Sequence, residues 1–218
     1  MIIEKIEESY ATPENKNWDG VHASSAAKCI RALYYDATLD KETVIEPRIK
    51  RVFENGDFFH RRLMSVLFRL KDVRVVAGEI KVPANEFVRG TCDAIIGLED
   101  ENFVLDFKSI NDSGFKFLKA PKQEHVIQLG LYIYYFKLKR GLIIYESKDN
   151  QELKEFLIDI TDPQTAKLLD DTFTKIGYLT NCIKSKTLPT KPEFDVSEQW
   201  RCNYCNYKEE CAKNHNIQ

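Results

Sequence analysis

The sequence predicts an α/β fold with a mixed β-sheet, and three features of its pattern support that class. Two helical segments come first, strand patterns begin at Val73, and helices and strands then alternate towards the C-terminus. This order is typical of one sheet flanked by helices. The chain has 218 residues, enough for one domain with a small appendage but cramped for two full domains.

Two helices are expected before the first strand. Ser24 or Ser25 can cap a helix that runs through Cys29, because a serine hydroxyl accepts a hydrogen bond from a free N–H of the first turn. The segment from Phe53 to Leu70 has the apolar periodicity of a second, amphipathic helix. The stretch up to Asn17 is polar, and we expect it to be loosely ordered.

Strands are expected from Val73 onward, where β-branched and aromatic residues are concentrated. The strand-like runs cover residues 73–82, 87–98, 102–110, 141–147 and 153–160. Polar residues between the second and third runs predict a hairpin. Helical periodicity returns from about Lys122 to Lys139, before the fourth run. After the last run, a long helix capped by Thr161 is expected to continue to about Lys186.

The third strand-like run carries the first candidate chemistry. Side chains alternate along a strand, so Asp106 and Lys108 share one face while Phe107 turns to the other. The predicted hairpin can bring Asp93 beside Asp106. Two carboxylates at that distance repel each other unless a cation lies between them, and hard oxygen ligands suit Mg2+ or Mn2+. Lys108 can then orient an attacking water or help to deprotonate it.

Two helical pairs fit the same site. Gly56 and His60 lie one turn apart in the second helix, and an imidazole suits manganese better than magnesium. Gln128 and Tyr132 are also four residues apart and share a helix face, where a polar pair can hold a phosphate or a base. Taken singly, each feature has an ordinary interpretation as a solvated residue or a local hydrogen bond. The hypothesis of a metal-dependent site therefore rests on the combination.

Four cysteines from opposite ends of the chain predict a metal clasp that joins the termini. They are Cys29, Cys202, Cys205 and Cys211, the last three in a C-x2-C-x5-C run. Four thiolates hold either a tetrahedral zinc or a 4Fe-4S cluster, and one isolated cysteine with a compact triplet favours the cluster. The aromatic residues Trp200, Tyr204 and Tyr207 are expected to exclude water from it. Reduced thiols without a metal are the ordinary alternative.

Composition and charge restrict the partners and the compartment. A formal net charge of -2 argues against a protein that coats nucleic acid by bulk electrostatics, although it allows a local basic groove. No apolar stretch approaches the ~20 residues of a membrane span, and the N-terminal segment does not resemble a signal peptide, so we expect no membrane association and a cytoplasmic location. Cysteines stay reduced there, which makes Cys92 and Cys182 buried or idle thiols.

Taken in order, these motifs resemble those of the RecB-like branch of the PD-(D/E)xK nucleases. The matching positions are Gly56-x3-His60, Asp93, Asp106-Phe107-Lys108 and Gln128-x3-Tyr132. With the four cysteines added, the chain resembles the iron-sulfur members, chiefly the CRISPR-associated RecB-like exonucleases and their viral relatives. The resemblance covers about residues 24–211. Asp106 is a departure, because many relatives carry Glu at this position, although the family pattern admits either.

The resemblance implies an architecture. Residues 18–188 would form a restriction-endonuclease-like core, with a central mixed β-sheet flanked by helices. Residues 189–218 would form a cysteine-rich, cluster-binding cap that packs against the Cys29 region and joins the N- and C-terminal segments.

The resemblance also implies roles for single residues. The divalent ion, Mn2+ or Mg2+, would be bound by His60, Asp93, Asp106 and the carbonyl of Phe107. Lys108 would position the nucleophilic water. Gln128 and Tyr132 would contact the DNA strand near the scissile phosphate. The 4Fe-4S cluster on the four cysteines would be structural.

The activity that the resemblance implies is metal-dependent hydrolysis of DNA phosphodiester bonds by an exonuclease. Single-stranded ends are favoured, because bases can stack on aromatic residues such as Tyr34, Tyr35 and Tyr132. Partners in CRISPR integration, or in viral replication and recombination within a host cytoplasm, follow from the same resemblance. Two alternatives stay open. One is a catalytically inactive iron-sulfur subunit that binds DNA or acts as a scaffold in recombination, repair or CRISPR adaptation, and the other is an active enzyme with a zinc clasp.

Overall fold

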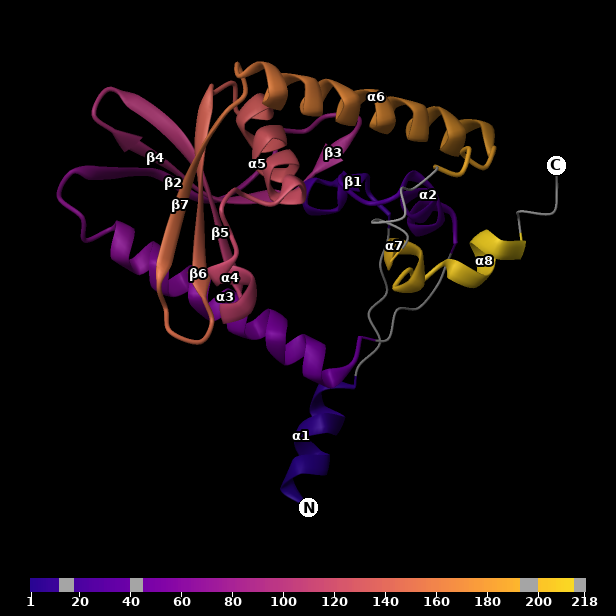
Figure 1. Ribbon diagram of the computed structural model, residues 1–218, viewed down its shortest axis with the longest axis horizontal. Coiled ribbons are helices and arrows are strands. Elements are labelled where there is room, and N and C mark those ends of the chain that lie inside the picture. Colours follow the sequence, from indigo (N-terminus) through magenta and orange to yellow (C-terminus); the bar gives the residue numbers. More distant parts are fainter. Residues whose placement is uncertain (12–17, 40–44, 193–199, 214–218) are drawn as a thin grey trace.

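The computed structural model describes residues 1–11, 18–39, 45–192 and 200–213, and it has the predicted α/β class (Figure 1). Its helices are α1 (Ile2–Tyr10), α2 (Ile30–Thr38), α3 (Pro47–Leu67), α4 (Asp112–Lys116), α5 (Gln123–Tyr135), α6 (Pro163–Ser185), α7 (Trp200–Asn203) and α8 (Lys208–Lys213), with a 3-10 turn η1 (Ala23–Ser25). Its strands are β1 (Val21–His22), β2 (Val73–Lys81), β3 (Val88–Arg89), β4 (Thr91–Leu98), β5 (Glu101–Ile110), β6 (Arg140–Ser147) and β7 (Leu153–Asp159). None of the helices in these ranges is both long and apolar enough to span a bilayer.

The main sheet is mixed, with strands in the order β2-β4-β5-β6-β7. β5 and β6 run parallel, whereas the other neighbouring pairs are antiparallel. A parallel pair needs a crossover connection, which here contains α4 and α5. The predicted hairpin joins β4 to β5, with Leu98 paired to Glu101. β1 and β3 form a separate parallel pair.

The sheet separates two apolar layers. Val104 of β5 packs in the layer that contains residues of α5 and α6. Its neighbours Leu105 and Phe107 pack in the other layer, with Phe59 and Leu67 of α3. This alternation confirms the period of two predicted for β5, and it places Asp106 and Lys108 on the α5 side. In Figure 1, α6 runs along the top and α3 crosses below the sheet.

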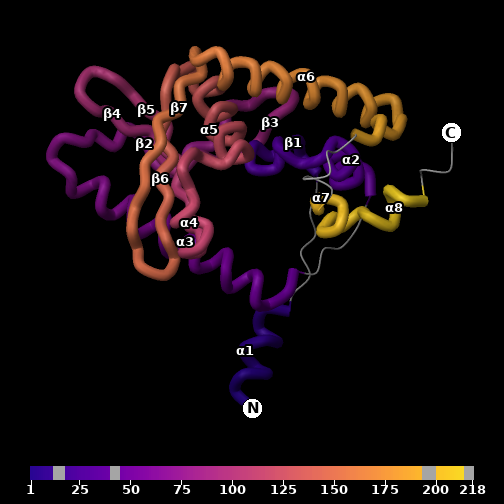
Figure 2. The backbone as a smooth tube through the Cα atoms, in the orientation of Figure 1, coloured from indigo at the N-terminus to yellow at the C-terminus, as the bar shows by residue number. Residues whose placement is uncertain are grey.

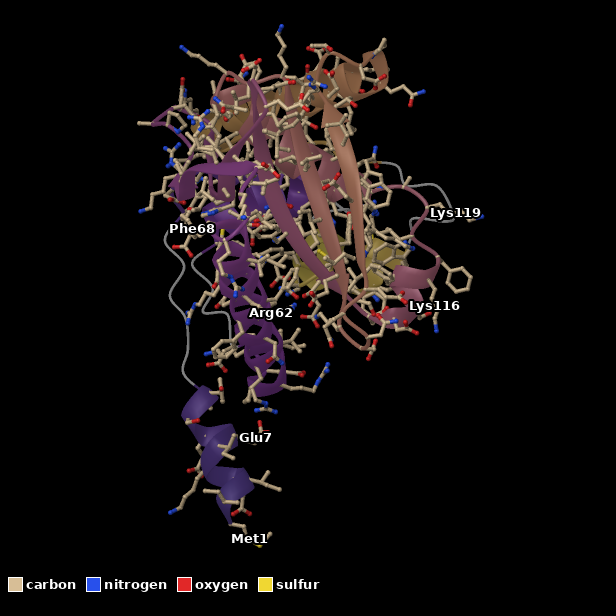
Figure 3. All side chains as sticks on the ribbon, turned by 90° about the vertical axis from the view of Figure 1, so that its left-hand side faces the viewer. Met1, Glu7, Arg62, Phe68, Lys116 and Lys119 are labelled. Carbon is tan, nitrogen blue, oxygen red and sulfur yellow. The ribbon has the colours of Figure 1, made fainter. Side chains whose placement is uncertain are left out.

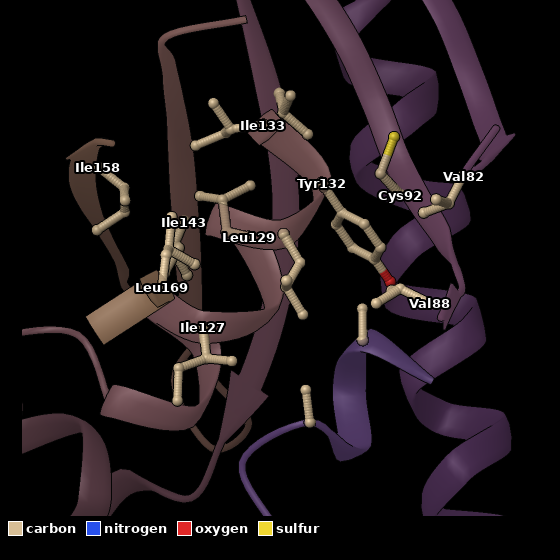
Figure 4. Close-up of a cluster of buried hydrophobic side chains, with 14 of the residues drawn as sticks. Val82, Val88, Cys92, Ile127, Leu129, Tyr132, Ile133, Ile143, Ile158 and Leu169 are labelled. Carbon is tan, nitrogen blue, oxygen red and sulfur yellow. The ribbon is translucent and has the colours of Figure 1, made fainter. Parts of the chain in front are cut away.

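The larger core cluster forms where α5 packs on the sheet. Leu129 and Ile133 are fully buried, and each such side chain contributes about 1.5–3 kcal/mol relative to an exposed one. Figure 4 shows the ring of Tyr132 turned from α5 towards Cys92 and Val88. Cys92 is buried, as predicted, and its burial raises the pKa of the thiol to about 12. This packing fixes α5 firmly against the strands that carry the aspartates.

Two helices start differently from the prediction. Ser24 and Ser25 lie in the turn η1, which ends before the extended residue Cys29, and α2 begins only after Cys29, so the predicted serine cap is wrong. The predicted cap of α6 by Thr161 is also wrong, because Asp162 directly precedes the proline at the first helical position and caps the helix with its carboxylate.

The N-terminal segment is helical where the structure describes it. Residues 2–10 form α1, so the expected loose order is wrong for this part, and residues 12–17 lie outside the described residues. Glu and Lys are good helix formers, which explains a helix in a polar stretch. Arg51 of α3 is bonded to Glu7 at 2.8 Å, and Tyr10 donates to Glu54 of α3 at 2.6 Å. Figure 3 shows α1 projecting beyond α3 towards Met1.

The C-terminal helices lie beside α2 (Figure 2). The hydroxyl of Tyr207 donates to Asp36 Oδ1 at 2.6 Å, and its ring centroid lies 5.4 Å from that of Tyr35. Arg31 Nε donates to the carbonyl of Pro189 at 2.8 Å. The two hydrogen bonds join residues that are 158 and 171 positions apart in the chain. α2 and the C-terminal helices are thus packed together on one side of the core.

Candidate active site

Asp93 and Asp106 meet where β4 and β5 pair. The sequence places Asp93 and Asp106 next to the pair of Ala94 with Leu105, at which the antiparallel ladder ends. Asp93 Oδ2 accepts a hydrogen bond of 2.6 Å from the backbone N–H of Phe107. This bond holds the Asp93 carboxylate across the end of the hairpin ladder, next to the strand that carries Asp106.

Asp106 is the most deeply buried group of this pair, with a relative exposure of 2%. Its Oδ2 lies 2.7 Å from Lys108 Nζ, and its Oδ1 accepts from Gln128 Nε2 at 3.3 Å. Burial raises the pKa of Asp106, the Lys108 ammonium opposes this, and the Asp93 carboxylate adds to it. A buried carboxylate in this position favours any cation that compensates its lost hydration.

His60 reaches the aspartates from α3. Its Nδ1 lies 3.2 Å from Asp93 Oδ1, and its ring packs edge-on against Phe107 with centroids 5.9 Å apart. Burial lowers the pKa of His60, but the hydrogen bond and the charge of Asp93 outweigh burial and raise it. One turn earlier, a Cβ at Gly56 would have no neighbour within 4 Å, so packing against the described residues does not require that glycine.

Gln128 and Tyr132 of α5 face the sheet, not the solvent. Gln128 Nε2 lies 3.3 Å from Asp106 Oδ1 and equally far from the hydroxyl of Tyr132. Tyr132 is only 2% exposed, and Tyr35, on α2, only 4%. Neither ring offers an open face, so the expected stacking of bases on these two tyrosines is wrong for this fold. Tyr132 instead holds Gln128 towards Asp106.

The negative charges of Asp93 and Asp106 are compensated by basic side chains of the protein. Among the residues that the structure describes, no three His, Cys, Asp or Glu side chains are arranged to hold a metal ion. His60 lies against Asp93, and Lys108 lies against Asp106. The donor set nevertheless fits a divalent ion, because two carboxylates suit Mg2+ or Mn2+ and an imidazole suits Mn2+.

The four predicted cysteine ligands come together at one cavity of about 240 Å3. The cavity is lined by Cys29, Cys202, Cys205 and Cys211. All four are free thiols and partly buried. Burial raises the pKa of Cys205, a backbone hydrogen bond at Tyr207 opposes this, and the three other cysteines add to it. Four sulfur donors around one cavity have the donor chemistry of a soft-metal or iron-sulfur site, although no three of the described thiols are arranged to hold a metal ion directly.

Arg31 is a residue of this cysteine site that the sequence does not single out. Its side chain is buried, and besides the bond to Pro189 its Nη1 lies 3.7 Å from Cys211 Sγ. The signal that could have revealed it is its position, two residues after Cys29. A buried guanidinium near sulfur ligands compensates the negative charge that thiolates carry.

The aromatic shell predicted around the cysteines is present only in part. Tyr207 is buried, with 9% exposure. Trp200 and Tyr204 are 55% and 82% exposed, so the prediction is wrong for these two residues. Helices of only four and six residues leave these rings outside the cavity, because such short elements have little surface to bury them.

Comparison with known proteins identifies the family. The family model for the PD-(D/E)XK nuclease superfamily matches residues 6–212. The chain belongs to the PD-(D/E)XK nuclease superfamily. It is therefore an enzyme, a nuclease, and the matched range contains Asp93, Asp106 and Lys108 as well as the cysteine site.

This nuclease is similar to proteins described as exonucleases over most of its length. A CRISPR-associated exonuclease Cas4 from Saccharolobus solfataricus is 24% identical over 217 residues, which is 97% of this chain and 95% of that protein. The fold is similar to an alkaline exonuclease from Laribacter hongkongensis, with a TM-score of 0.53, 15% identity and 84% and 95% of the two chains covered. A phage-related exonuclease from Haemophilus somnus has a TM-score of 0.52, 12% identity and coverage of 80% and 98%.

Proposed function

We propose that this nuclease is a divalent-metal-dependent DNA exonuclease, that it acts by preference on single-stranded ends, and that it carries a structural 4Fe-4S cluster. The observation that carries the proposal is the meeting of Asp93, Asp106, Lys108 and His60 on adjacent elements. The similar proteins described as exonucleases support the exonucleolytic mode.

The residues divide the work of phosphodiester hydrolysis. His60, Asp93, Asp106 and the carbonyl of Phe107 would hold a Mn2+ or Mg2+ ion. When bound, that ion would polarise the phosphate and lower the pKa of a coordinated water. Lys108, whose Nζ lies 2.7 Å from Asp106 Oδ2, would position the water for attack. Because water is the nucleophile, no covalent enzyme intermediate is needed.

Gln128 and Tyr132 support the site from α5, through hydrogen bonds that lead to Asp106. Gln128 holds Asp106 through Oδ1, which leaves the orientation of that carboxylate fixed when Lys108 moves towards water or phosphate. Burial raises the pKa of Tyr132 well above its usual value, so the hydroxyl stays protonated and keeps its bond to Gln128. Because both side chains are buried, we propose that the pair supports Asp106, and the contact of Gln128 and Tyr132 with DNA that the resemblance implies stays a prediction.

The cysteine site is proposed to hold the cluster in a structural role. Its four sulfur donors come from both ends of the described chain, and the fit of thiolates to a 4Fe-4S cluster supports this assignment. Residues 189–218 would then act as a cap on the core of residues 18–188. Partners from CRISPR integration are proposed on the likeness to the CRISPR-associated exonuclease.

Cleavage of labelled DNA tests the proposal directly. The full chain, freed of divalent ions by a chelator, is given Mn2+ or Mg2+ with linear single-stranded, linear double-stranded and circular single-stranded DNA. We expect loss of the linear single strand and survival of the circle. Asp93→Asn and Lys108→Ala should lower the rate at least about 100-fold, because each removes a charge at the reacting phosphate.

Lys116→Ala is the matched control. Lys116 is also a lysine paired with an aspartate, 2.6 Å from Asp112, but it is exposed on α4. Its loss should leave the rate within about twofold, as expected for a surface ion pair. Full activity of both site variants would show that the site is assigned wrongly. A wild-type chain that binds DNA but cuts none of the three substrates would favour the inactive scaffold.

A further inference from the structure

His125 of α5 and Tyr145 of β6 form a hydrogen-bonded pair beside the candidate active site. Nδ1 of His125 lies 2.7 Å from the Tyr145 hydroxyl. Tyr145 is the residue of β6 that pairs with Lys108 of β5. His125 lies one helical turn before Gln128, whose amide contacts Asp106. The imidazole is therefore held over the same face of the sheet as the proposed catalytic lysine.

The hydrogen bonds of Tyr145 fix the tautomer of His125. The hydroxyl oxygen of Tyr145 accepts a hydrogen bond from the backbone N–H of Lys122 at 3.1 Å. Because the tyrosine is fully buried, its own proton also needs an acceptor, and Nδ1 of His125 is the one that the described residues provide. Nδ1 is then unprotonated, and the single proton of the neutral ring lies on Nε2.

The ring is neutral and its Nε2 is not fully buried. Burial lowers the pKa of His125 to about 3, and the charges of Lys108 and Lys122 act in the same direction. Within the described part of the chain, Nε2 makes no hydrogen bond, and it is not one of the fully buried polar atoms without a partner, so it keeps some exposure on a partly exposed residue. An oriented N–H donor without a partner among the described residues thus lies close enough to Lys108 to feel its charge.

We propose that His125 is a further substrate-binding residue of this nuclease, whose Nε2–H donates a hydrogen bond to a phosphate oxygen of the DNA strand bound beside Lys108. The inference rests on the proposed function. A neutral imidazole adds a directional contact without placing a second positive charge against the lysine. Tyr145 holds the ring from the other side, so little rotational freedom is lost when the strand binds.

Three variants separate a contact with DNA from a purely structural role. His125→Ala removes both ring nitrogens. His125→Asn puts an amide near the position of Nδ1, where it can still accept the bond from Tyr145, but it removes the donor at Nε2. His125→Gln puts an amide donor near Nε2. We expect kcat/KM on linear single-stranded DNA to fall about 10- to 100-fold for Ala and Asn and to recover for Gln.

The outcomes distinguish this inference from the proposed function. If the wild type cleaves DNA and His125→Asn keeps its full rate while Gln does not, the histidine only supports Tyr145 and the inference is wrong. If the wild type cleaves none of the substrates, the proposed function itself is wrong. The 15N shifts of the His125 ring in the metal-free protein at neutral pH give a readout apart from activity: we expect the Nε2–H tautomer, and a proton on Nδ1 would overturn the inference.

Discussion

Charge compensation at single residues explains how two aspartates are kept together in a folded chain. Asp106 is nearly inaccessible and Asp93 is only partly open, so each would be costly as an isolated ion. Lys108 compensates one carboxylate and His60 the other. A divalent ion that enters must compete with these two cations, which links metal binding to the protonation of His60.

The raised pKa of His60 predicts proton release on metal binding. Without metal, the contact between imidazolium and Asp93 stabilises the fold below pH 6.5 and this contribution is lost as pH rises through the raised pKa. A metal ligand must be the neutral imidazole, so below that pKa each Mn2+ displaces a proton and the apparent affinity strengthens as pH rises. Calorimetry in two buffers of different ionisation enthalpy measures the proton count.

A surface pair provides the control for this prediction. His22 lies 3.1 Å from Asp19 in an exposed contact between an imidazole and a carboxylate. His60→Ala should remove the proton release and weaken Mn2+ binding, whereas His22→Ala should leave both unchanged. Proton release that persists in His60→Ala would mean that this imidazole is not a ligand.

At the scale of elements, the site is built from both sides of the sheet. α3 supplies His60 from one layer and α5 supplies Gln128 from the other, while β4 and β5 supply the aspartates between them. The arrangement depends on close packing of α5 against α6, where a Cβ added to Gly130 would lie 2.8 Å from Leu169 Cδ2. Helix packing therefore controls the geometry of the site.

Two helical glycines should respond to alanine with opposite signs. At Gly177 of α6 an added Cβ has no neighbour within 4 Å, so Gly177→Ala should stabilise the protein by about 0.8–1.0 kcal/mol, the difference in helix propensity. At Gly130 the clash with Leu169 should outweigh propensity, and overpacking of this kind costs about 1–3 kcal/mol. Urea denaturation measures both changes. Equal stabilisation by the two variants would contradict the packing described for α5.

How far the sequence predicts the molecule depends on the distance over which a pattern acts. The period of two in β5 predicts which side chains share a face, and a short hairpin predicts that Asp93 meets Asp106, because both follow from local geometry. Helical periodicity predicts that Gln128 and Tyr132 share one face of the helix. It does not predict which layer that face packs against, so the burial of the two side chains was not predicted. The place of Arg31 in the cysteine site depends on contacts with residues more than a hundred positions away, and no local sequence pattern contains that information.

At the scale of the whole molecule, the cysteine site lies where α2 packs against the C-terminal helices. α2 and the C-terminal helices are joined by the bond from Tyr207 to Asp36 and by Arg31, which contacts both Pro189 and Cys211. Short helices of four and six residues cannot be stable on their own. A metal centre on four sulfurs would therefore contribute folding energy to this region directly.

Removal of one cysteine tests whether the clasp orders the C-terminal segment. Cys29→Ala should abolish bound iron and sulfide and expose the chain after Pro189 to limited proteolysis, because a cluster needs all four thiolates. Cys29 precedes α2 but its side chain caps no N–H, so the change removes no helix cap. Metal analysis and protease digestion of the aerobically and anaerobically purified protein measure both effects.

Cys182 supplies the matched control for that experiment. It is also a free thiol, but it is buried within α6 and does not line the cysteine cavity. Cys182→Ala should keep the iron and the protease resistance of the C-terminal segment, at the cost of a small cavity in the core. Full iron content in Cys29→Ala would refute the four-cysteine clasp. Bound zinc without iron in the wild type would keep the clasp and change only its metal, because four thiolates at one cavity serve either.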